Sequence, residues 1–274
     1  MAATEPIDIV ELGIADAPAG LVLSTEAGWN QNEADWRFFL GHGIVFGVRD
    51  GDRLVASAAL LPYSAGNAWI SMVLVTPDFR RRGIATKLID ACLDAAKRRG
   101  LTSWLDATPA GATVYGPLGF KPTLQLRRLR LERPQATEAA QPLSAGSLDA
   151  LATRDGRTMG FDRSTLLSAF AARAGSRIVS DERAMALVRN GRTARHIGPL
   201  LADDADQALR LVDAVVGSES GPWLIDAVHA QSEFLDGLVR AGWNIERPFQ
   251  RMRFGPTTDS PAQLPFAVAG PEFG

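Results

Sequence analysis

A short basic segment stands between an apolar run and an amphipathic run, and its residue types suit the binding of an anion. The apolar run at 69–75 is rich in β-branched residues and predicts a buried strand that stops at Pro77. The next run has apolar residues at helical spacing, and Gly100 is placed to end that helix. A helix start offers free N–H groups and partial positive charge to an anion. The segment consists of Arg80, Arg81, Arg82, Gly83, Ile84, Ala85 and Thr86.

The basic segment by itself also fits a solvated basic turn. It is neither a Walker loop, which needs Gly-Lys-Ser/Thr, nor a dinucleotide-binding turn, which needs three spaced glycines. The longer pattern is more specific, because Arg80-x-x-Gly83-x-Ala85 follows Val75-x-Pro77 and precedes an amphipathic helix. This pattern resembles the acetyl-CoA pyrophosphate loop of the GNAT superfamily of N-acetyltransferases.

A second motif lies further along the same predicted domain. Residues 112–120 read Ala-Thr-Val-Tyr-Gly-Pro-Leu-Gly-Phe, with Tyr115 four positions before Gly119. They resemble the family segment that ends in Tyr-x-x-x-Gly-Phe. The expected order of strands and helices across most of residues 7–132 is also similar to the GNAT arrangement.

The resemblance implies how acetyl-CoA would be held. The basic segment would bind the pyrophosphate through backbone N–H groups, where small residues at Gly83 and Ala85 permit a close approach. The pantetheine arm would lie along the edge of the strand Val73-Leu74-Val75, although these residues also suit a plain core strand. Thr108 stands where many relatives carry an Asn that contacts the cofactor, so a cofactor contact is expected there from a different residue type.

Tyr115 is the residue that the resemblance implies as general acid to the departing thiolate. A phenol suits this role because its pKa lies above that of a thiol, so it stays protonated at neutral pH. The alternative is a half-buried aromatic residue on a short helix. The general base is open among Asp106, Glu33, Asp35 and a water relay.

The acceptor site is expected at the break between the first two helices, by resemblance to the mobile helix–helix loop of the family. Trp29 could pack against a substrate there, and Asn30 and Gln31 could form hydrogen bonds to it. Asp106 is counted with these substrate-binding residues. The alternative for the loop is an aromatic core plug with solvated polar residues around it.

Composition limits the partners. The net charge of −2 gives no global attraction to nucleic acid or to an anionic membrane, so neither is expected. The first residues lack the apolar core of a signal peptide and no stretch approaches a transmembrane helix in length, so the cytoplasm is the expected location. The oligomeric state is open between monomer and homodimer.

The single cysteine, Cys92, lies on the apolar stripe of the predicted helix and is interpreted as a core residue. The three histidines, His42, His196 and His229, lack metal-ligand spacing, so no metal is expected. They are interpreted as structural or surface residues.

The second half of the chain repeats the order of elements of the first, with Trp223–Ala227 similar to Trp104–Ala107 and Gly242-Trp243 similar to Gly119-Phe120. We therefore expect an α/β fold with two GNAT-like domains in tandem, each a mixed, mostly antiparallel sheet flanked by helices. The expected boundaries are 1–133 for the catalytic domain, 134–146 for a linker, 147–255 for a degenerate domain and 256–274 for a tail.

The second copy is expected to lack the chemistry of the first. Asp203, Asp204 and Asp206 stand where the first copy has its basic segment, and acidic residues would repel a pyrophosphate. Leu238 stands where the first copy has Tyr115. The tail, rich in Pro and Gly, is expected either to be disordered or to pack as an extended arm across a domain.

The sequence therefore predicts an acetyl-CoA-dependent N-acetyltransferase for a small amine or amino acid. The alternatives are a protein or peptide acetyltransferase, which needs an open groove, and a non-catalytic CoA-binding sensor. Retention of both motifs argues against the sensor.

Overall fold

The computed structural model describes residues 8–132, 143–181, 183–256 and 263–274. The chain divides into two compact units. Unit 1 comprises Met1–Pro62 and Gly66–Trp104, and unit 2 comprises Tyr63–Ala65 and Leu105–Gly274.

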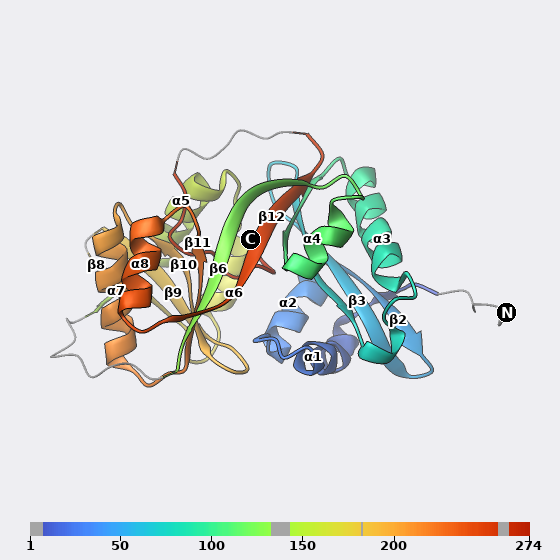
Figure 1. Ribbon diagram of the computed structural model, residues 1–274, viewed down its shortest axis with the longest axis horizontal. Coiled ribbons are helices and arrows are strands. Elements are labelled where there is room, and N and C mark those ends of the chain that lie inside the picture. The colour runs from blue at the N-terminus through green and yellow to red at the C-terminus, as the bar shows by residue number, and fades with distance from the viewer. Residues whose placement is uncertain (1–7, 133–142, 182, 257–262) are drawn as a thin grey trace. The chain divides into compact units, whose positions relative to one another are not determined.

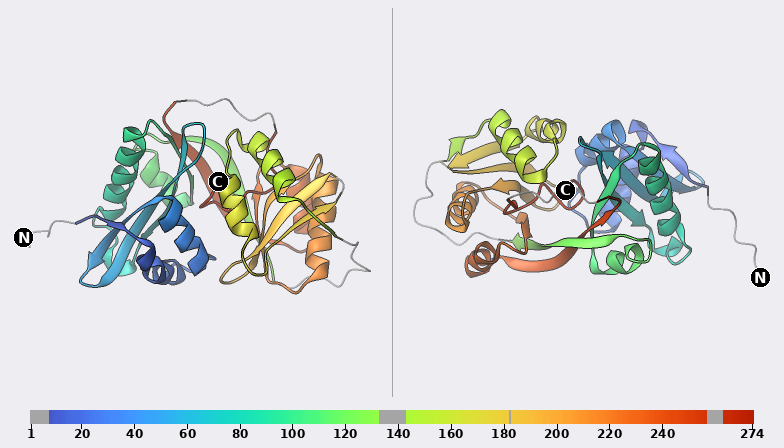
Figure 2. Two further views of the ribbon diagram at one scale, coloured as in Figure 1. Left: turned by 180° about the vertical axis from the view of Figure 1, so that it is seen from behind. Right: turned by 90° about the horizontal axis from the view of Figure 1, so that it is seen from above.

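Unit 1 is a mixed sheet with helices on both faces (Figures 1 and 2). Its elements are β1 (Val10–Leu12), η1 (Ile14–Asp16), α1 (Ala17–Glu26), α2 (Glu33–His42), β2 (Ile44–Asp50), β3 (Arg53–Pro62), β4 (Asn67–Val75), η2 (Pro77–Phe79), α3 (Ile84–Arg98) and the start of β5 (Thr102–Ala107). The strands lie in the order β1-β2-β3-β4-β5, antiparallel except for the parallel β4–β5 pair. α3 packs on β2, β3 and β4, and α1 and α2 cover the other face (Figure 2).

The helix after the basic segment forms as the sequence predicts. The stripe that includes Ile84, Leu88 and Cys92 is buried. Gly100 has a φ of 65° and follows the last turn, where glycine adopts the left-handed conformation at low cost. Cys92 is a free, buried thiol and therefore a core residue.

Unit 2 holds the second repeat and the last strand of the first. Its elements are α4 (Pro109–Tyr115), β6 (Lys121–Leu131), β7 (Ser144–Ala145), α5 (Leu148–Met159), α6 (Ser164–Ala171), β8 (Arg177–Asp181), β9 (Ala184–Asn190), β10 (Arg195–Leu201), α7 (Ala205–Ser218), β11 (Trp223–Val228), α8 (Ser232–Arg240) and β12 (Asn244–Phe254). From the end of β5 the strands follow in the order β12-β6-β11-β10-β9-β8-β7. The β10–β11 pair is parallel, and the other registers recorded in this unit are antiparallel.

The tandem arrangement is confirmed at the level of elements. α1-α2-β2-β3-β4-α3-β5-α4-β6 is followed by α5-α6-β8-β9-β10-α7-β11-α8-β12. The last strands are exchanged between the repeats, because β6 pairs with β11 and β12 lies between β5 and β6. The sheet of unit 2 is therefore built from both halves of the sequence.

The short helix that carries Tyr115 is α4, which starts at Pro109 because Thr108 caps it and ends at Tyr115 before Gly116-Pro117. The last strand, β12, starts at Asn244, and its polar first half pairs with β6.

The predicted linker and tail are described only in part. Residues 133–142 and 257–262 lie outside the described residues, and the end of the predicted linker carries β7. The tail from 263 onward is packed in unit 2, with Phe266 at 4% and Phe273 at 0% exposure. For this part of the tail, the packed-arm alternative is the one that the structure supports.

Candidate active site

The loop between β4 and α3 has the backbone of an anion-binding turn. Arg81 and Gly83 both have left-handed backbone, with φ of 63° and 76°. For Arg81, a residue with a Cβ, this conformation is uncommon and costs about 1 kcal/mol or more. Gly83 is the N-cap of α3, and no described side chain caps this helix. The first N–H groups of α3 therefore have no intrahelical acceptor and no side-chain cap.

Two arginine side chains of the loop are held by backbone carbonyls. Arg80 Nε donates to Val75 O at 3.0 Å, and Arg82 Nη2 donates to Asp78 O at 2.7 Å. The Arg82 guanidinium also lies 4.7 Å from the centre of the Phe79 ring. These contacts fix the exposed loop while leaving positive charge beside the helix start.

β4 leaves its partner strand before it reaches the loop. Its register with β5 covers Asn67 to Trp69. A bulge follows, where Met72 has a φ of 52° and its carbonyl accepts a hydrogen bond from Ser57 Oγ at 2.8 Å. Bulges redirect a strand and are frequent beside functional sites. Of the predicted pantetheine residues after the bulge, Leu74 is core, and Val73 and Val75 are half-buried.

The equivalent helix start in the second repeat is closed by a carboxylate. Asp204 is the N-cap of α7 and accepts from Gln207 N at 2.8 Å. Asp203 forms an ion pair with Arg154. The Asp204 carboxylate places a negative charge at this helix start and already accepts from one of its free N–H groups, so the start of α7 disfavours an anion.

The break between α1 and α2 has a defined structure. Asn32 and Asp35 form a reciprocal capping box at the start of α2. Trp36 is fully buried and donates from Nε1 to Ser24 Oγ at 3.0 Å, so this tryptophan belongs to the core. Trp29 is half-buried. The capping box and Trp36 hold the loop that carries the predicted acceptor residues.

Two amide side chains of this loop are buried. Asn30 is 7% exposed and Gln31 is 3% exposed. The side-chain oxygen Oε1 of Gln31 has no hydrogen-bond partner among the described residues. A buried, unsatisfied acceptor costs free energy, so this oxygen is suited to a donor that arrives from elsewhere.

Asp106, near the end of β5, is tied to an arginine that the sequence analysis did not single out. Its two oxygens accept from Nε and Nη2 of Arg251 on β12, both at 2.8 Å. Burial raises the pKa of Asp106, and the Arg251 guanidinium opposes that rise. Arg251 was missed because the pairing of β12 with β5 is a long-range consequence of strand exchange.

The other two candidate bases also have partners. Glu33 forms an exposed i,i+4 ion pair with Arg37 at 2.7 Å, and Asp35 belongs to the capping box. Each of the three carboxylates is thus engaged in a structural interaction.

Thr108 and Tyr115 begin and end α4. Thr108 Oγ1 accepts from Gly111 N at 3.2 Å, which gives this side chain a capping role. Tyr115 is half-buried, and its ring centre lies 5.9 Å from that of Phe120. The short helix therefore holds Tyr115 against the Gly119-Phe120 turn.

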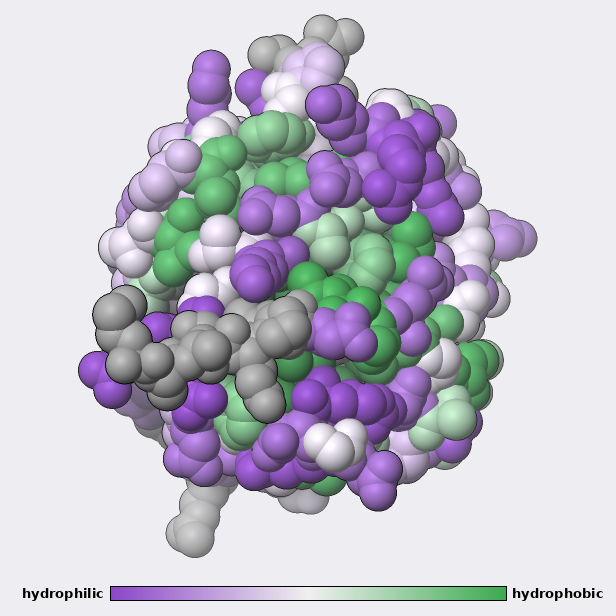
Figure 3. All heavy atoms as spheres, turned by 90° about the vertical axis from the view of Figure 1, so that its right-hand side faces the viewer, coloured by the Kyte–Doolittle hydropathy of each residue, from purple (hydrophilic) through white to green (hydrophobic). Residues whose placement is uncertain are grey.

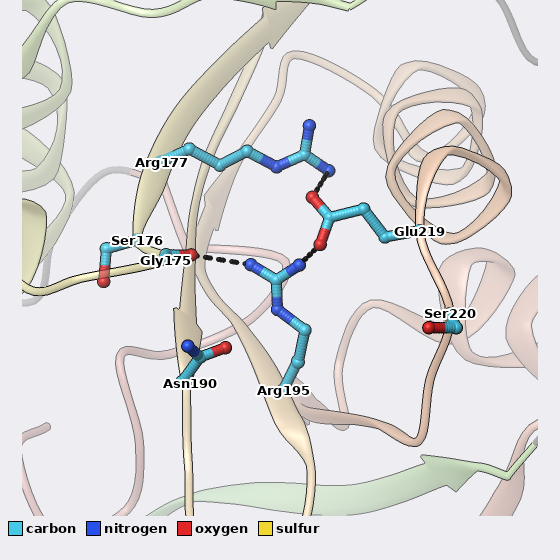
Figure 4. A pocket seen from close by; sticks show the side chains of 7 residues that line it. All are labelled: Gly175, Ser176, Arg177, Asn190, Arg195, Glu219 and Ser220. Carbon is cyan, nitrogen blue, oxygen red and sulfur yellow. Dashed lines mark hydrogen bonds and ion pairs between the residues drawn. The ribbon is translucent and has the colours of Figure 1, made fainter.

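A pocket of about 630 Å³ in unit 2 contains none of the predicted site residues (Figure 4). Glu219 lies between Arg177 and Arg195, pairing with Arg177 at 2.7 Å and also with Arg195. Arg195 also donates to Gly175 O at 2.7 Å. The Glu219 carboxylate neutralises part of the positive charge of the two arginines. We therefore interpret the pocket as a structural ion-pair cluster.

The surface that bears α3 has mixed character. In Figure 3, hydrophilic and hydrophobic residues are interspersed over the visible part of that side. No metal-binding group of three or more His, Cys, Asp or Glu side chains occurs among the described residues. In that part of the chain, no helix has the length and apolar character that crossing a bilayer requires.

Two repeats of a mixed sheet flanked by helices, with an uncapped helix start after a basic loop in the first, define a tandem acetyltransferase-type fold. Models of the acetyltransferase (GNAT) family and the acetyltransferase (GNAT) domain match residues 16–120 and 151–267, together more than half of the chain. The chain belongs to the GNAT acetyltransferase family. It is an acyltransferase that acts with acetyl-CoA.

Three similar proteins match this chain over most of their own length. An uncharacterized N-acetyltransferase, YitH, of Bacillus subtilis is 22% identical over 235 residues, which cover 82% of this chain and 83% of the relative. A proposed acetyltransferase from Pyrococcus horikoshii superposes with a TM-score of 0.81 at 19% identity, over 99% of this chain and 97% of the other. A tandem GNAT protein from the clavulanic acid biosynthesis pathway gives 0.63 at 15% identity, over 92% and 100%. These likenesses show the fold.

Proposed function

We propose that this acyltransferase transfers the acetyl group of acetyl-CoA directly to a primary amine of a small molecule or amino acid. The observation that carries the proposal is the helix start of α3, uncapped and preceded by left-handed Arg81 and Gly83. Successive N–H groups in such a turn form a concave site for phosphate oxygens. The residues proposed to contact the cofactor are Val73, Leu74, Val75, Arg80, Arg81, Arg82, Gly83, Ile84, Ala85, Thr86 and Thr108.

In the proposed reaction the amine nitrogen attacks the thioester carbon, and the tetrahedral intermediate collapses with loss of the CoA thiolate. Tyr115 donates its phenolic proton to that sulfur. The amine loses its proton to water rather than to a named carboxylate, because Asp106, Glu33 and Asp35 all have structural partners.

The acceptor is proposed to contact the α1–α2 loop. An ammonium or amine N–H is a hydrogen-bond donor, and the buried Oε1 of Gln31 is an acceptor without a partner. Trp29, two residues earlier in the same loop, is half-buried and is proposed to supply an apolar surface. This pairing favours a compact amine over a flat peptide surface, since Gln31 is only 3% exposed.

The experiment measures thiol release from acetyl-CoA across a library of amines and amino acids, with calorimetry for acetyl-CoA binding. Turnover on a small amine, reduced in Gln31→Leu through KM, is the expected result. Turnover confined to peptide N-termini would identify a peptide acetyltransferase. Binding without turnover on any acceptor would identify a CoA sensor.

A further inference from the structure

We propose that the gap between β10 and β11 is a binding groove for an extended peptide, that residues 264–269 of this chain fill it, and that the second repeat is thereby closed to acetyl-CoA. The prediction of how many acetyl-CoA molecules bind per chain rests on the proposed function. The contacts that form the groove all lie within unit 2.

The two strands pair only briefly before the segment enters. Their recorded parallel register joins Arg195–Ile197 to Trp223–Ile225. An irregularity in β10 follows between Ile197 and Leu200. Beyond it, Ala267 forms a bridge to Leu200 on one side and to Ala227 on the other. The segment therefore takes the place of direct strand pairing.

On the β10 side, the segment exchanges backbone hydrogen bonds with a single residue. Leu200 N donates to Ala267 O at 3.0 Å, and Ala267 N donates back to Leu200 O at 3.3 Å, which is the reciprocal pair of an antiparallel bridge. Leu200 O also accepts from Phe266 N at 2.9 Å.

On the β11 side, the same segment forms backbone hydrogen bonds with a second strand. Val228 N donates to Phe266 O at 3.0 Å, and Val268 N donates to Asp226 O at 3.0 Å. A ligand that pairs with both walls through its backbone is an extended peptide, in the mode of strand addition.

Side chains of the segment complete the core of unit 2. Phe266 packs edge-to-face on Phe234, with ring centres 5.4 Å apart. Val268 belongs to a buried cluster with Val228 and Phe249. Burying each of these two side chains contributes about 1.5–3 kcal/mol, as for residues of a hydrophobic core.

Two buried arginines hold the residues that follow. Arg189 donates to Ala269 O at 2.9 Å and lies 3.6 Å from Glu272. Arg163, paired with Asp155 at 2.7 Å, donates to Phe273 O at 3.3 Å. Hydrogen bonds from a charged donor in a buried site are stronger than neutral ones.

The groove corresponds to a defined place in the first repeat. By element order β10, α7 and β11 match β4, α3 and β5, and the proposed pantetheine edge is on β4. In the second repeat that edge pairs with residues 264–269, and the start of α7 is capped by Asp204. Both positions that a CoA would need are occupied, which predicts one acetyl-CoA per chain.

Hydrogen exchange of the intact chain tests the groove. The amides of Phe266 and Val268 are expected to exchange as slowly as that of Leu200, because all three donate to backbone carbonyls inside the core of unit 2. Exchange of Phe266 and Val268 at the rate of an unprotected peptide would overturn the inference.

A substitution in β10 tests the contact between this strand and Val268 of the inserted segment. A Cβ added at Gly198 would lie 2.1 Å from Val268 O, so Gly198→Ala is expected to speed exchange at Val268 at least tenfold. Gly156→Ala, whose Cβ would meet nothing nearer than 3.8 Å, is the matched control and should leave it unchanged. A folded Gly198→Ala chain with unchanged exchange at Val268 would contradict the placement of the segment. If Gly198→Ala does not fold, exchange in the intact chain decides.

Calorimetry with acetyl-CoA tests the consequence. One molecule bound per chain is expected. Two bound per chain would overturn the closure of the second repeat. None bound would instead overturn the proposed function, and the exchange rates would still decide whether the groove is filled.

Discussion

Two aspartates at matching positions of the repeats each face an arginine on an exchanged strand. Asp106 meets Arg251 on β12, and Asp226 meets Arg128 on β6, each through two contacts of 2.8 Å. Burial acts to raise the pKa of Asp226, but Arg128 and a hydrogen bond from His196 together hold it below its usual range. Removing one partner of such a buried pair costs about 3–5 kcal/mol, so both arginines are structural.

Tyr115→Phe removes one hydroxyl and is expected to lower turnover by roughly 10²-fold or more, the usual contribution of a general acid. Acetyl-CoA affinity should change little, because the ring remains. Steady-state kinetics and calorimetry measure the two effects. The chain offers its own control in Tyr63→Phe, which removes the hydroxyl that donates to Phe273 O at 2.8 Å. Equal turnover in all three chains would remove Tyr115 from the mechanism.

His196 makes stability depend on pH. Burial, aided by the nearby Arg189, lowers the pKa of His196 to about 4, against 6.5 for the unperturbed group. Between pH 6.5 and 4 the imidazole of His196 therefore binds a proton in the unfolded chain but not in the folded chain. The folding stability that is present above pH 6.5 is lost as the pH falls toward 4.

Between pH 7 and pH 5 the loss of unfolding free energy caused by His196 is about 2 kcal/mol, at roughly 1.4 kcal/mol per pH unit for one proton. Denaturant titrations of wild type and His196→Gln at both pH values measure it, with the exposed His229→Gln as control. An identical pH dependence in wild type and His196→Gln would show that His196 is not the group whose protonation lowers stability.

The two corresponding helices α3 and α7 begin in opposite ways. α3 starts at a left-handed glycine with no side-chain cap, whereas α7 starts at an aspartate that bonds to its first turn. The macrodipole is the same in both helices, so the N-cap residue decides which start is open to an anion. The corresponding helix start is therefore left without a side-chain cap in the first repeat and is capped by a carboxylate in the second.

Gly83→Asp would place a carboxylate at the start of α3 and is expected to weaken acetyl-CoA binding at least tenfold, about 1.4 kcal/mol. Gly51→Asp is the matched control, because Gly51 also has a positive φ, 56°, and nothing within 4 Å of an added Cβ. Calorimetry compares the two variants. If both bind as wild type does, the helix start does not hold the pyrophosphate.

Because the last strands are exchanged, the sheet of each repeat needs a strand from the other repeat. β6 pairs with all six residues of β11 and, on its other edge, with most of β12. A repeat cut from the chain would lose a central strand of its sheet. The predicted domain boundaries at 133 and 147 stay a prediction.

A fragment of residues 147–274 lacks β6 and exposes the edge of β11 along Trp223–Val228. Such an unpaired, apolar edge promotes aggregation, so we expect the fragment alone to be insoluble or to lack the exchange protection of the intact chain. Co-expression with residues 1–146 should restore a soluble complex. A monomeric, fully protected fragment would show that strand exchange is dispensable.

Local chemistry made much of the protein predictable. The basic loop, the helix from Ile84 with its glycine end, and the repeated order of elements follow from residue spacing, because short-range periodicity and turn residues determine them. The family follows from the same motifs. The residue roles in the site remain predictions.

The sequence by itself determined that there are two similar repeats and that only the first has a helix start fit for an anion, since both depend on residues close in the chain. Tertiary structure alone decided that β6 and β12 change places, that Arg251 neutralises Asp106, and that residues 264–269 lie between β10 and β11. The reason is physical: these pairings join residues from about 40 to 145 positions apart, and no local pattern encodes which edge a distant strand will cover.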